Sequence, residues 1–333
     1  AGGGVFALSV SYAFALLAEA LLAAALLRRT DPDVSMRPRF GSKEVRRRIR
    51  HLGSYTLLAD SMVFIGARMD TILIAGIRNA AAAAPFAAAL KLQSALQAVA
   101  LPFVNLLMPM VSELWARGDR ERVAWRLALT TRLALQSTLP VALGLSLFSF
   151  DLMSLWLGPE AGEETAVIAI LLVSTQVVTL TALPAEKALI GIGNVRWIGG
   201  LAAIEAVVNL ALTIALVILY GAVGAALATL IAYGFLSPVR FPLVARAIDM
   251  PVRDLIGIGL WPALRASLPA AAVMVLVFLA VPSGGLRGVV GLAAGISVAL
   301  IVGVVQVGPR RLRDALRSVV AGGRESEPYP VET

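Results

Sequence analysis

The sequence predicts an all-α membrane protein, a polytopic helical bundle of about nine transmembrane helices. Hydrophobic residues make up 59% of the chain and charged residues only 15%, whereas a soluble domain typically carries roughly 25% charged residues. The apolar residues gather in stretches close to the ~20 residues that a helix needs to cross a bilayer. The basic residues gather in every second gap between these stretches. We therefore expect lipid, rather than water, to surround most of the chain.

The apolar stretches give the expected spans in order. The third span contains Pro102 and Pro109, and a proline inside a helix removes a backbone hydrogen bond and bends the axis, so we expect a kink there. The interval 240–265 mixes charged with apolar residues and predicts a short amphipathic segment in the membrane interface. The expected spans are roughly residues 5–27, 52–77, 81–111, 127–150, 166–183, 198–219, 222–236, 268–281 and 289–307.

The distribution of Lys and Arg predicts the orientation. The gaps after the first, third, fifth and seventh spans and the tail after the last span are basic, whereas the other gaps are short or acidic. Because cytoplasmic loops carry the excess of Lys and Arg, we expect a cytoplasmic C-terminus and an outer Ala1 in a bacterial inner membrane. An outer start implies an odd number of spans upstream, so the chain is expected to be a fragment of a longer transporter-like protein.

The composition argues against several classes of function. The chain has no cysteine and a single histidine, His51, so neither a thiolate metal site nor a His-rich one is expected. The net charge of +8 lies in loops rather than on amphipathic faces, which argues against nucleic acid as a partner. No nucleotide-binding or hydrolase motif occurs, so no catalytic residue, cofactor or enzymatic activity is expected. The acidic interval 151–164 is expected to be a solvated turn.

Several ionisable residues fall inside the expected spans, where an uncompensated charge costs at least ~2.5–3.5 kcal/mol. Each of them therefore needs a protein or water partner. Arg68 and Asp70 lie near the outer end of the second span. Lys91 lies at a matching depth in the antiparallel third span, so an Asp70–Lys91 pair can form. The ionisable residues are Glu19, Asp60, Arg68, Asp70, Lys91, Arg132 and Glu205.

We interpret part of this set, with two amides of the third span, as the lining of a wet cavity. The substrate-cavity candidates are Arg68, Asp70, Lys91, Gln97 and Asn105. The alternative is that the intramembrane charges brace packed helices. This alternative applies most to Asp60 and Glu205, which have Ser61 and Asn209 as polar neighbours. These two residues and Glu19 are also candidates for coupling to an ion.

Short motifs follow one another in a characteristic order. An Asp-led segment ends the second span, an aromatic residue followed by small residues begins the third, and a Pro- and Ser-containing element leads into a Gly–Asp turn. The segments are 70–76, 85–89, 107–114 with 118–119, 155–158, 188–193 and 221–224. In this order they resemble the C-terminal part of the polysaccharide flippase family, the Wzx-type members of the multidrug/oligosaccharidyl-lipid/polysaccharide exporter superfamily.

The resemblance implies a protein of about fourteen spans, built from two six-helix lobes and a final helix pair. The second lobe would be similar to that of the multidrug and toxic-compound (MATE) exporters. Residues 1–27 would then be the last helix of a missing first lobe, and 28–51 a basic cytoplasmic linker. The remaining divisions would be the second lobe at 52–246, an interfacial amphipathic segment at 247–266, a terminal helix pair at 267–308 and a partly disordered cytoplasmic tail at 309–333.

The function implied by the resemblance is the flipping of a lipid-linked oligosaccharide across the inner membrane for surface polysaccharide synthesis, by alternating access. The substrate would carry a polyprenyl diphosphate, with Arg68 and Lys91 lining its cavity and Asp70 or Asp60 coupling an ion. The implied partners are this lipid, the bilayer and other membrane proteins of polysaccharide assembly. Three alternatives stay open: a multidrug or cation antiporter of the same superfamily, a membrane-embedded glycosyltransferase or polymerase, and a scaffold for an envelope assembly machine.

Overall fold

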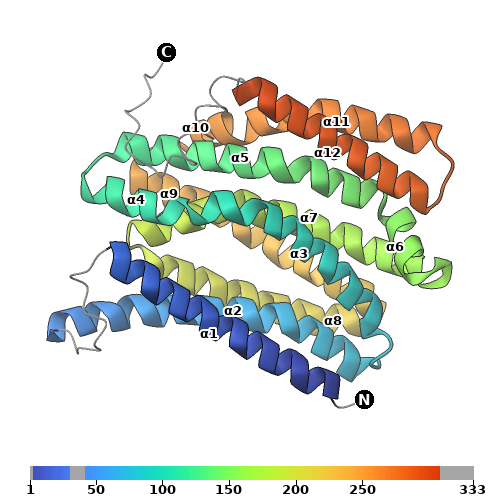
Figure 1. Ribbon diagram of the computed structural model, residues 1–333, viewed down its shortest axis with the longest axis horizontal. Helices are drawn as coiled ribbons and strands as arrows, with labels where there is room; N and C mark the ends of the chain where they lie inside the picture. The colour runs from blue at the N-terminus through green and yellow to red at the C-terminus, as the bar shows by residue number, and fades with distance from the viewer. Residues whose placement is uncertain (1–2, 31–41, 308–333) are drawn as a thin grey trace. The chain divides into compact units, whose positions relative to one another are not determined.

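Helices form all the regular structure in the residues that the computed structural model describes, 3–30 and 42–307, which confirms the all-α class (Figure 1). The chain divides into two compact units, Ala1–His51 and Leu52–Thr333. The first unit contains α1 (Gly3–Thr30) and the beginning of α2 (Lys43–Ile77). The boundary between the units therefore lies within one continuous helix, α2.

The second unit continues from α2 through a series of long helices and short connecting ones. Their order along the chain is α3 (Ala83–Asn105), α4 (Leu107–Ala116), α5 (Arg120–Leu147), α6 (Ser149–Leu157), α7 (Pro159–Gly191), α8 (Val195–Leu236), the 3-10 helix η1 (Ser237–Val239), α9 (Arg240–Ile248), α10 (Val252–Leu255), the π-helical turn η2 (Ile256–Leu260), α11 (Trp261–Ala280) and α12 (Gly285–Val307).

Six helices of the described chain are long and apolar enough to cross a membrane, and a seventh results if α5 and α6, which meet at 66°, form one broken span. The chain is therefore a multi-pass membrane protein. Two features explain why more spans were expected. Helix α2 carries Asp60, Arg68 and Asp70 within one membrane thickness, so it is less apolar than the others. Helix α8 contains two of the expected spans.

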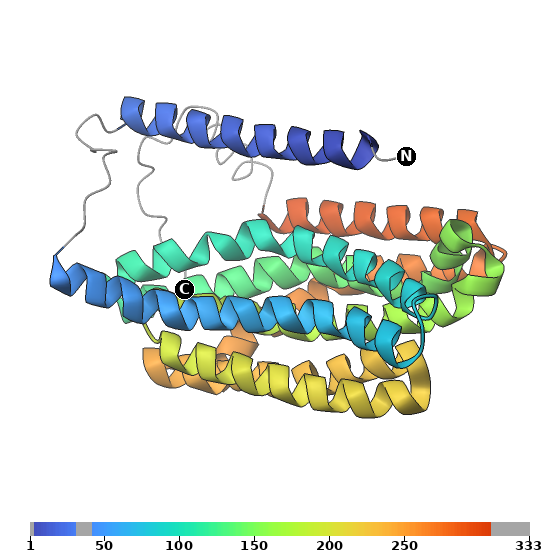
Figure 2. The same ribbon diagram turned by 90° about the horizontal axis from the view of Figure 1, so that it is seen from below.

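The two halves of α8 run antiparallel because the chain reverses at Gly221. This residue has φ 61° and ψ −138°, a conformation open to glycine. Residues on either side of it meet in pairs: Asn209 contacts Thr229, and a Cβ on Gly224 would lie 2.0 Å from the carbonyl oxygen of Leu216. The expected spans 198–219 and 222–236 therefore lie side by side, as the course of α8 in Figure 2 shows.

Arg78 fastens the turn between α2 and α3 to this reversal. Its Nε donates to the carbonyl of Val217 (3.2 Å) and its Nη2 donates to the carbonyl of Ile218 (2.7 Å). Carbonyls at a helix C-terminus lack intrahelical partners and carry partial negative charge, so a guanidinium satisfies both needs. Arg78 thus has a structural role at the end of the bundle that lies opposite the basic loops.

The expected kink in the third span is an interruption of one residue. Helix α3 ends at Asn105 and α4 begins at Leu107, and the two together form one candidate span, Ala83–Ala116. Pro109 then falls in the first turn of α4, where the missing N–H removes no helical hydrogen bond, whereas Pro102 is accommodated inside α3.

The acidic interval 151–164 is only partly the solvated turn that was expected: Glu160, Glu163 and Glu164 are exposed, but Asp151 is buried. The interval forms the end of α6 and the beginning of α7, and the Asp151 side chain is 1% exposed. Asp151 Oδ2 accepts from Arg287 Nε (2.6 Å), and Oδ1 accepts from Arg287 Nη2 (3.0 Å) and from the Gly284 amide (3.0 Å). The arginine also lies 4.4 Å from the ring centre of Phe278. The carboxylate is buried because it holds the α11–α12 turn against α6.

The terminal pair α11–α12 packs on α5 and α6 through a row of glycines (Figure 1). A Cβ on Gly291 would lie 2.1 Å from the Phe148 ring, and one on Gly288 would lie 3.0 Å from the Cβ of Asp151 in α6. Small residues allow such close approach where no hydrophobic force drives helices together in lipid. Glycine at these positions therefore sets the distance between α12 and the helices beneath it.

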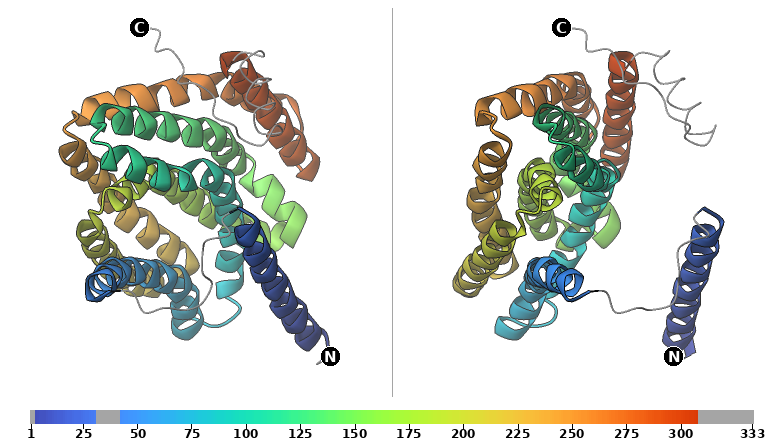
Figure 3. Two further views of the ribbon diagram at one scale, coloured as in Figure 1. Left: turned by 60° about the vertical axis from the view of Figure 1, so that its left-hand side comes forward. Right: turned by 90° about the vertical axis from the view of Figure 1, so that its left-hand side faces the viewer.

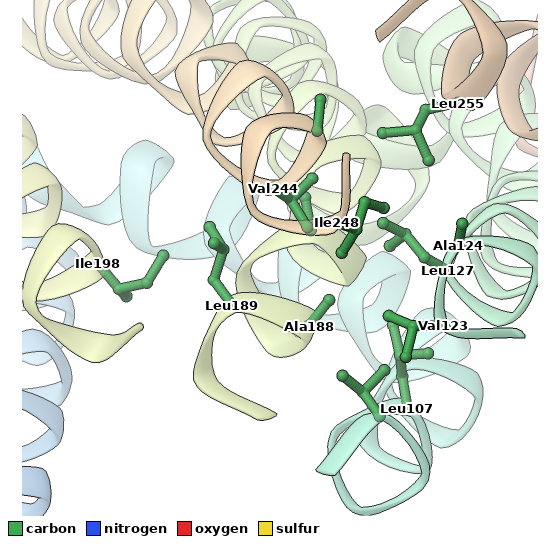
Figure 4. Packing of buried hydrophobic residues seen from close by; sticks show 13 residues of the cluster. Leu107, Val123, Ala124, Leu127, Ala188, Leu189, Ile198, Val244, Ile248 and Leu255 are labelled. Carbon is green, nitrogen blue, oxygen red and sulfur yellow. The ribbon is translucent and has the colours of Figure 1, made fainter. Parts of the chain in front are cut away.

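Helix α7 passes through the interior of the second unit (Figure 3). It packs against α3, α5, α6 and α8 and is the most buried of the candidate spans. Toward the basic end, one buried cluster joins α4, α5, α7 and α9 (Figure 4). Its members include Leu107, Leu127, Leu189, Val244 and Ile248. This cluster fixes the short helices that precede the terminal pair.

The glycine row gives a direct test of the packing of α12. We expect Gly291→Ala to lower the stability by about 1–3 kcal/mol, because the added methyl group overlaps the rigid, fully buried ring of Phe148. The matched control is Gly303→Ala in the same helix, where a Cβ meets nothing within 4 Å. Thermal unfolding in detergent measures both variants, and equal unfolding temperatures would contradict this packing.

Candidate functional site

The carboxylate of Asp70 is enclosed by side chains from both halves of α8. Asp70 is 6% exposed, and its Oδ1 and Oδ2 accept hydrogen bonds from the hydroxyls of Thr213 and Thr229, each at 3.0 Å. Asn209 joins the two threonines: its Oδ1 accepts from Thr213 (2.8 Å), and its Nδ2 donates to Thr229 Oγ1 (3.5 Å). We call these four residues the Asp70 cluster. It exists because α8 reverses and brings positions 213 and 229 to the same depth.

The Asp70 cluster has more acceptor atoms than hydroxyl hydrogens. The Thr213 hydroxyl lies within hydrogen-bond distance of both Asp70 and Asn209. The Thr229 hydroxyl lies within the same range of Asp70 and the Ala225 carbonyl (2.9 Å). Each hydroxyl has one hydrogen, so two hydrogens serve four acceptors. Within the described chain no Lys or Arg forms an ion pair with Asp70. The charge of Asp70 therefore has no counter-charge in the described chain, and balancing it requires one further positive charge.

A proton or a monovalent cation meets this requirement. A buried carboxylate without a counter-charge is unfavourable, so it binds a proton or pairs with a cation. Carboxylate, hydroxyl, amide and carbonyl oxygens are the ligands that hard cations take. One carboxylate balances one positive charge. Among the described residues there is no group of three or more His, Cys, Asp or Glu that could hold a metal ion.

The expected Asp70–Lys91 pair does not form. Asp70 is buried against α8, whereas Lys91 is exposed on α3. Lys91 shares its face of α3 with Ser94, Ala98 and Asn105, at spacings of three, seven and fourteen residues that keep side chains on one side of a helix. All four are exposed, and no described carboxylate pairs with Lys91. The structure thus shows an exposed face of α3 with one lysine and two neutral polar side chains, separate from the Asp70 cluster, which we call the cationic face of α3.

The other site residues predicted from the sequence do not lie together. Gln97 is exposed on α3 but lies six residues from Lys91 and hence on another side of the helix. Asp60 and Arg68 belong to α2, but their side chains lie outside the described part of the structure. Glu19 is exposed on α1, in the first unit.

Glu205 belongs to a buried ion-pair network near the basic end of the bundle. Arg240 donates to both of its carboxylate oxygens, through Nη1 at 2.6 Å and Nη2 at 2.8 Å. Ser237 also donates to Glu205 (3.2 Å), and Arg240 Nε donates to Glu186 at 2.9 Å. The side chains of Arg240 and Glu205 are 7% and 3% exposed. Such a bidentate, desolvated pair braces α8 to α9, and Glu186 extends the brace to α7.

Sequence reasoning missed the partners of the buried acids. Thr213 and Thr229 are uncharged residues in apolar helices, and Arg240 was placed in an amphipathic interval at the interface. One available signal was the two-residue gap, 220–221, between the expected spans 198–219 and 222–236. Two helices leaving a turn there at 1.5 Å per residue bring positions 213 and 229 to similar depths. The Asp151–Arg287 pair links positions 136 residues apart, and no local pattern indicates it.

Comparison with known proteins gives a fold but no sequence family. No family model matches the sequence, and no curated protein matches it. The structure is similar to the solved structure of the lipid II flippase MurJ in its inward closed conformation, with a TM-score of 0.58 and 19% sequence identity. The match covers 77% of this chain and 53% of that one, so the chain spans about half the length of the flippase. The arrangement of its helices is a MurJ-like membrane fold.

The Arg240 network predicts that removing Arg240 strongly destabilises the protein and that a second substitution partly compensates the loss. We expect Arg240→Met to destabilise the protein by about 3–5 kcal/mol, because it leaves Glu205 and Glu186 buried without their counter-charge. Adding Glu205→Gln to Arg240→Met is expected to restore a large part of the loss. The matched control is Arg117→Met, which breaks the exposed pair with Glu113 and should change stability by less than about 1 kcal/mol. Denaturation in detergent measures the wild type and the three variants, and a loss for Arg240→Met no larger than the control's would contradict the brace.

Proposed function

We propose that this chain is the second lobe and terminal helix pair of a transporter that flips a lipid-linked oligosaccharide across the bacterial inner membrane by alternating access. The MurJ-like fold is the observation that carries the proposal. In this proposal the basic end of the bundle and the C-terminus face the cytoplasm. The divisions expected from the sequence then apply: a lobe at 52–246, an interfacial segment at 247–266 and a terminal pair at 267–308.

The cationic face of α3 suits the substrate. A polyprenyl diphosphate carries negative charge and a polar glycan, so it needs a wet passage with cationic and hydrogen-bonding groups. Lys91 is exposed and without an acidic partner in the described chain, and Ser94 and Asn105 extend the polar surface along the helix. In our proposal Lys91 binds the diphosphate and Arg68 adds to the passage, whereas Gln97 lies on another side of α3.

The Asp70 cluster suits the coupling of flipping to an ion. Binding a proton or a monovalent cation neutralises Asp70 and changes the bonds that hold α2 to both halves of α8. A change in the hydrogen bonds between helices can shift the equilibrium between two packed arrangements of those helices. Glu205 is less suited to this role because Arg240 already balances its charge.

The nearest alternative is a multidrug or cation antiporter of the same superfamily, because it would use the Asp70 cluster equally well. The two functions differ in the role of Lys91. A lipid-linked diphosphate needs a cation in the passage, whereas a cationic drug is repelled by one.

A complementation experiment tests the flippase. The complete native reading frame is expressed in a host that lacks its own surface-polysaccharide flippase, and surface glycan is measured. We expect rescue by the wild type and a loss of at least about tenfold for Lys91→Ala, because the removed ammonium leaves a diphosphate charge unpaired. The matched control is Lys187→Ala, which removes a lysine near the C-terminal end of a different helix, α7. Quantified membrane levels exclude poor expression. Equal rescue by Lys91→Ala would contradict the role of Lys91, and drug resistance without glycan rescue would favour the antiporter.

The ion site has its own test, which does not require transport. If a cation binds the Asp70 cluster, its presence at about 100 times its dissociation constant stabilises the protein by about 2.7 kcal/mol. We expect sodium or lithium to raise the unfolding temperature relative to choline at equal ionic strength, and Asp70→Asn and Thr213→Val to abolish the shift. A wild type that responds to pH but to neither cation would assign the site to a proton, and no response to either would contradict ion coupling at Asp70.

A further inference from the structure

A cavity of about 490 Å³ lies at the basic end of the second unit, away from the Asp70 cluster and the cationic face of α3. It is formed by the first turns of α5, the turn after α9 and the π-helical turn η2. Ala124 and Ile248, which line it, belong to the buried cluster shown in Figure 4, so its inner wall is firmly packed. Its volume is in the range of binding sites for small molecules and headgroups.

The surroundings of the cavity are those of a membrane interface. Trp125 and Ile258 line it and are 52% and 45% exposed, and Trp261, one turn after Ile258, is 54% exposed. Both tryptophans carry an arginine on the ring: Arg126 lies 5.0 Å from the ring centre of Trp125, and Arg265 lies 5.1 Å from that of Trp261. Exposed aromatic rings beside basic groups are typical of the headgroup level of a bilayer. The cavity therefore opens where phospholipid headgroups lie.

The charges at the cavity are of both signs. Arg120 lines it, and Arg126 stacks on its Trp125 wall. Two carboxylates, Glu121 and Asp249, line it as well. Asp249 occupies the left-handed cap of α9 (φ 60°), which places an acidic side chain where glycine or asparagine is usual.

The two carboxylates of the cavity differ from the other acids at this end. Three neighbouring acids have an arginine partner: Glu113 pairs with Arg117, Asp119 with Arg122 and Asp254 with Arg253. Glu121 and Asp249 have no ion-pair partner within the described chain. Among the described acids of residues 113–121 and 249–254, the two without an ion-pair partner thus both line this cavity, beside Arg120 and Arg126.

We propose that this cavity binds a phospholipid whose headgroup joins a phosphate to a primary ammonium, of the phosphatidylethanolamine type. The phosphate lies at Arg120 and Arg126, and the ammonium donates to Glu121 and Asp249. The upper acyl chain lies on the apolar wall that includes Ile258. An anionic headgroup would leave the two carboxylates unmatched, and a quaternary ammonium has no N–H to donate to them.

Such a lipid would bridge two parts of the chain. Arg120 and Glu121 begin α5, which belongs to the lobe, whereas Asp249 and Ile258 lie on the connection that leads into α11. A ligand that binds both parts stabilises their contact. The proposal does not depend on what the protein transports.

Native mass spectrometry of the purified full chain tests the proposal with three lipids of equal acyl composition: phosphatidylethanolamine, phosphatidylcholine and phosphatidylglycerol. We expect phosphatidylethanolamine to be retained several-fold more than either other lipid. The double variant Glu121→Gln/Asp249→Asn is expected to retain it no better than phosphatidylcholine. The matched control is Glu113→Gln, which removes an acid from the same end but outside the cavity, and it should keep the preference.

Three outcomes would overturn the proposal. Equal retention of the three lipids would show that the headgroup is not recognised. Preferential retention of phosphatidylglycerol would assign the binding to the basic surface alone. An unchanged preference in the double variant would place the lipid elsewhere. Size-exclusion profiles of the variants check that they fold, and all the substituted side chains are solvent-exposed, so folding should be unaffected.

Discussion

A charged side chain that enters an apolar bundle must meet an opposite charge or a set of polar atoms there, and the helices of this protein are joined at the points where that demand is met. Asp151 and Arg287 join α6 to the terminal pair, and Glu205 and Arg240 join α8 to α9. Asp70 meets hydroxyl and amide groups instead, and joins α2 to both halves of α8. Since apolar surface gives little preference between a helix and lipid, these polar contacts and the close glycine packing specify which helices are neighbours.

The three acids differ in how completely their charge is balanced, and this difference separates structural from functional candidates. Asp151 has a bidentate arginine and a backbone amide, and Glu205 has a bidentate arginine and a serine. Asp70 has only neutral donors, whose hydrogens are shared with other acceptors. A site that must bind and release a charge cannot hold a permanent counter-charge, so the incomplete balance of Asp70 is what an exchangeable ion requires.

Much of the fold could be predicted from the sequence, and little of the site. The apolar runs and the alternating basic gaps depend on the surrounding lipid and water, so they indicate the class, the helices and even the reversal at 220–221. The partner of a buried charge depends on which helices touch, and that is not a local property. Lys91 and Asp70 were expected at matching depths and have opposite charges, yet Asp70 is buried against α8 and Lys91 is exposed on α3. The interval 151–164 has the composition of a solvated loop, but Arg287 buries its first acid.

The position of Asp70 along α2 affects how a rotation of this helix would move its other end. The boundary between the two compact units lies at His51, inside this single uninterrupted helix. Asp70 stands nineteen residues further along, which is about 28 Å at 1.5 Å per residue, on the part of the helix held by α8. In a continuous rigid helix, the displacement caused by a rotation grows with distance from the point of attachment. A small rotation of α2 about its attachment at Asp70 would therefore move the helix backbone near Leu52 much farther than the backbone near Asp70.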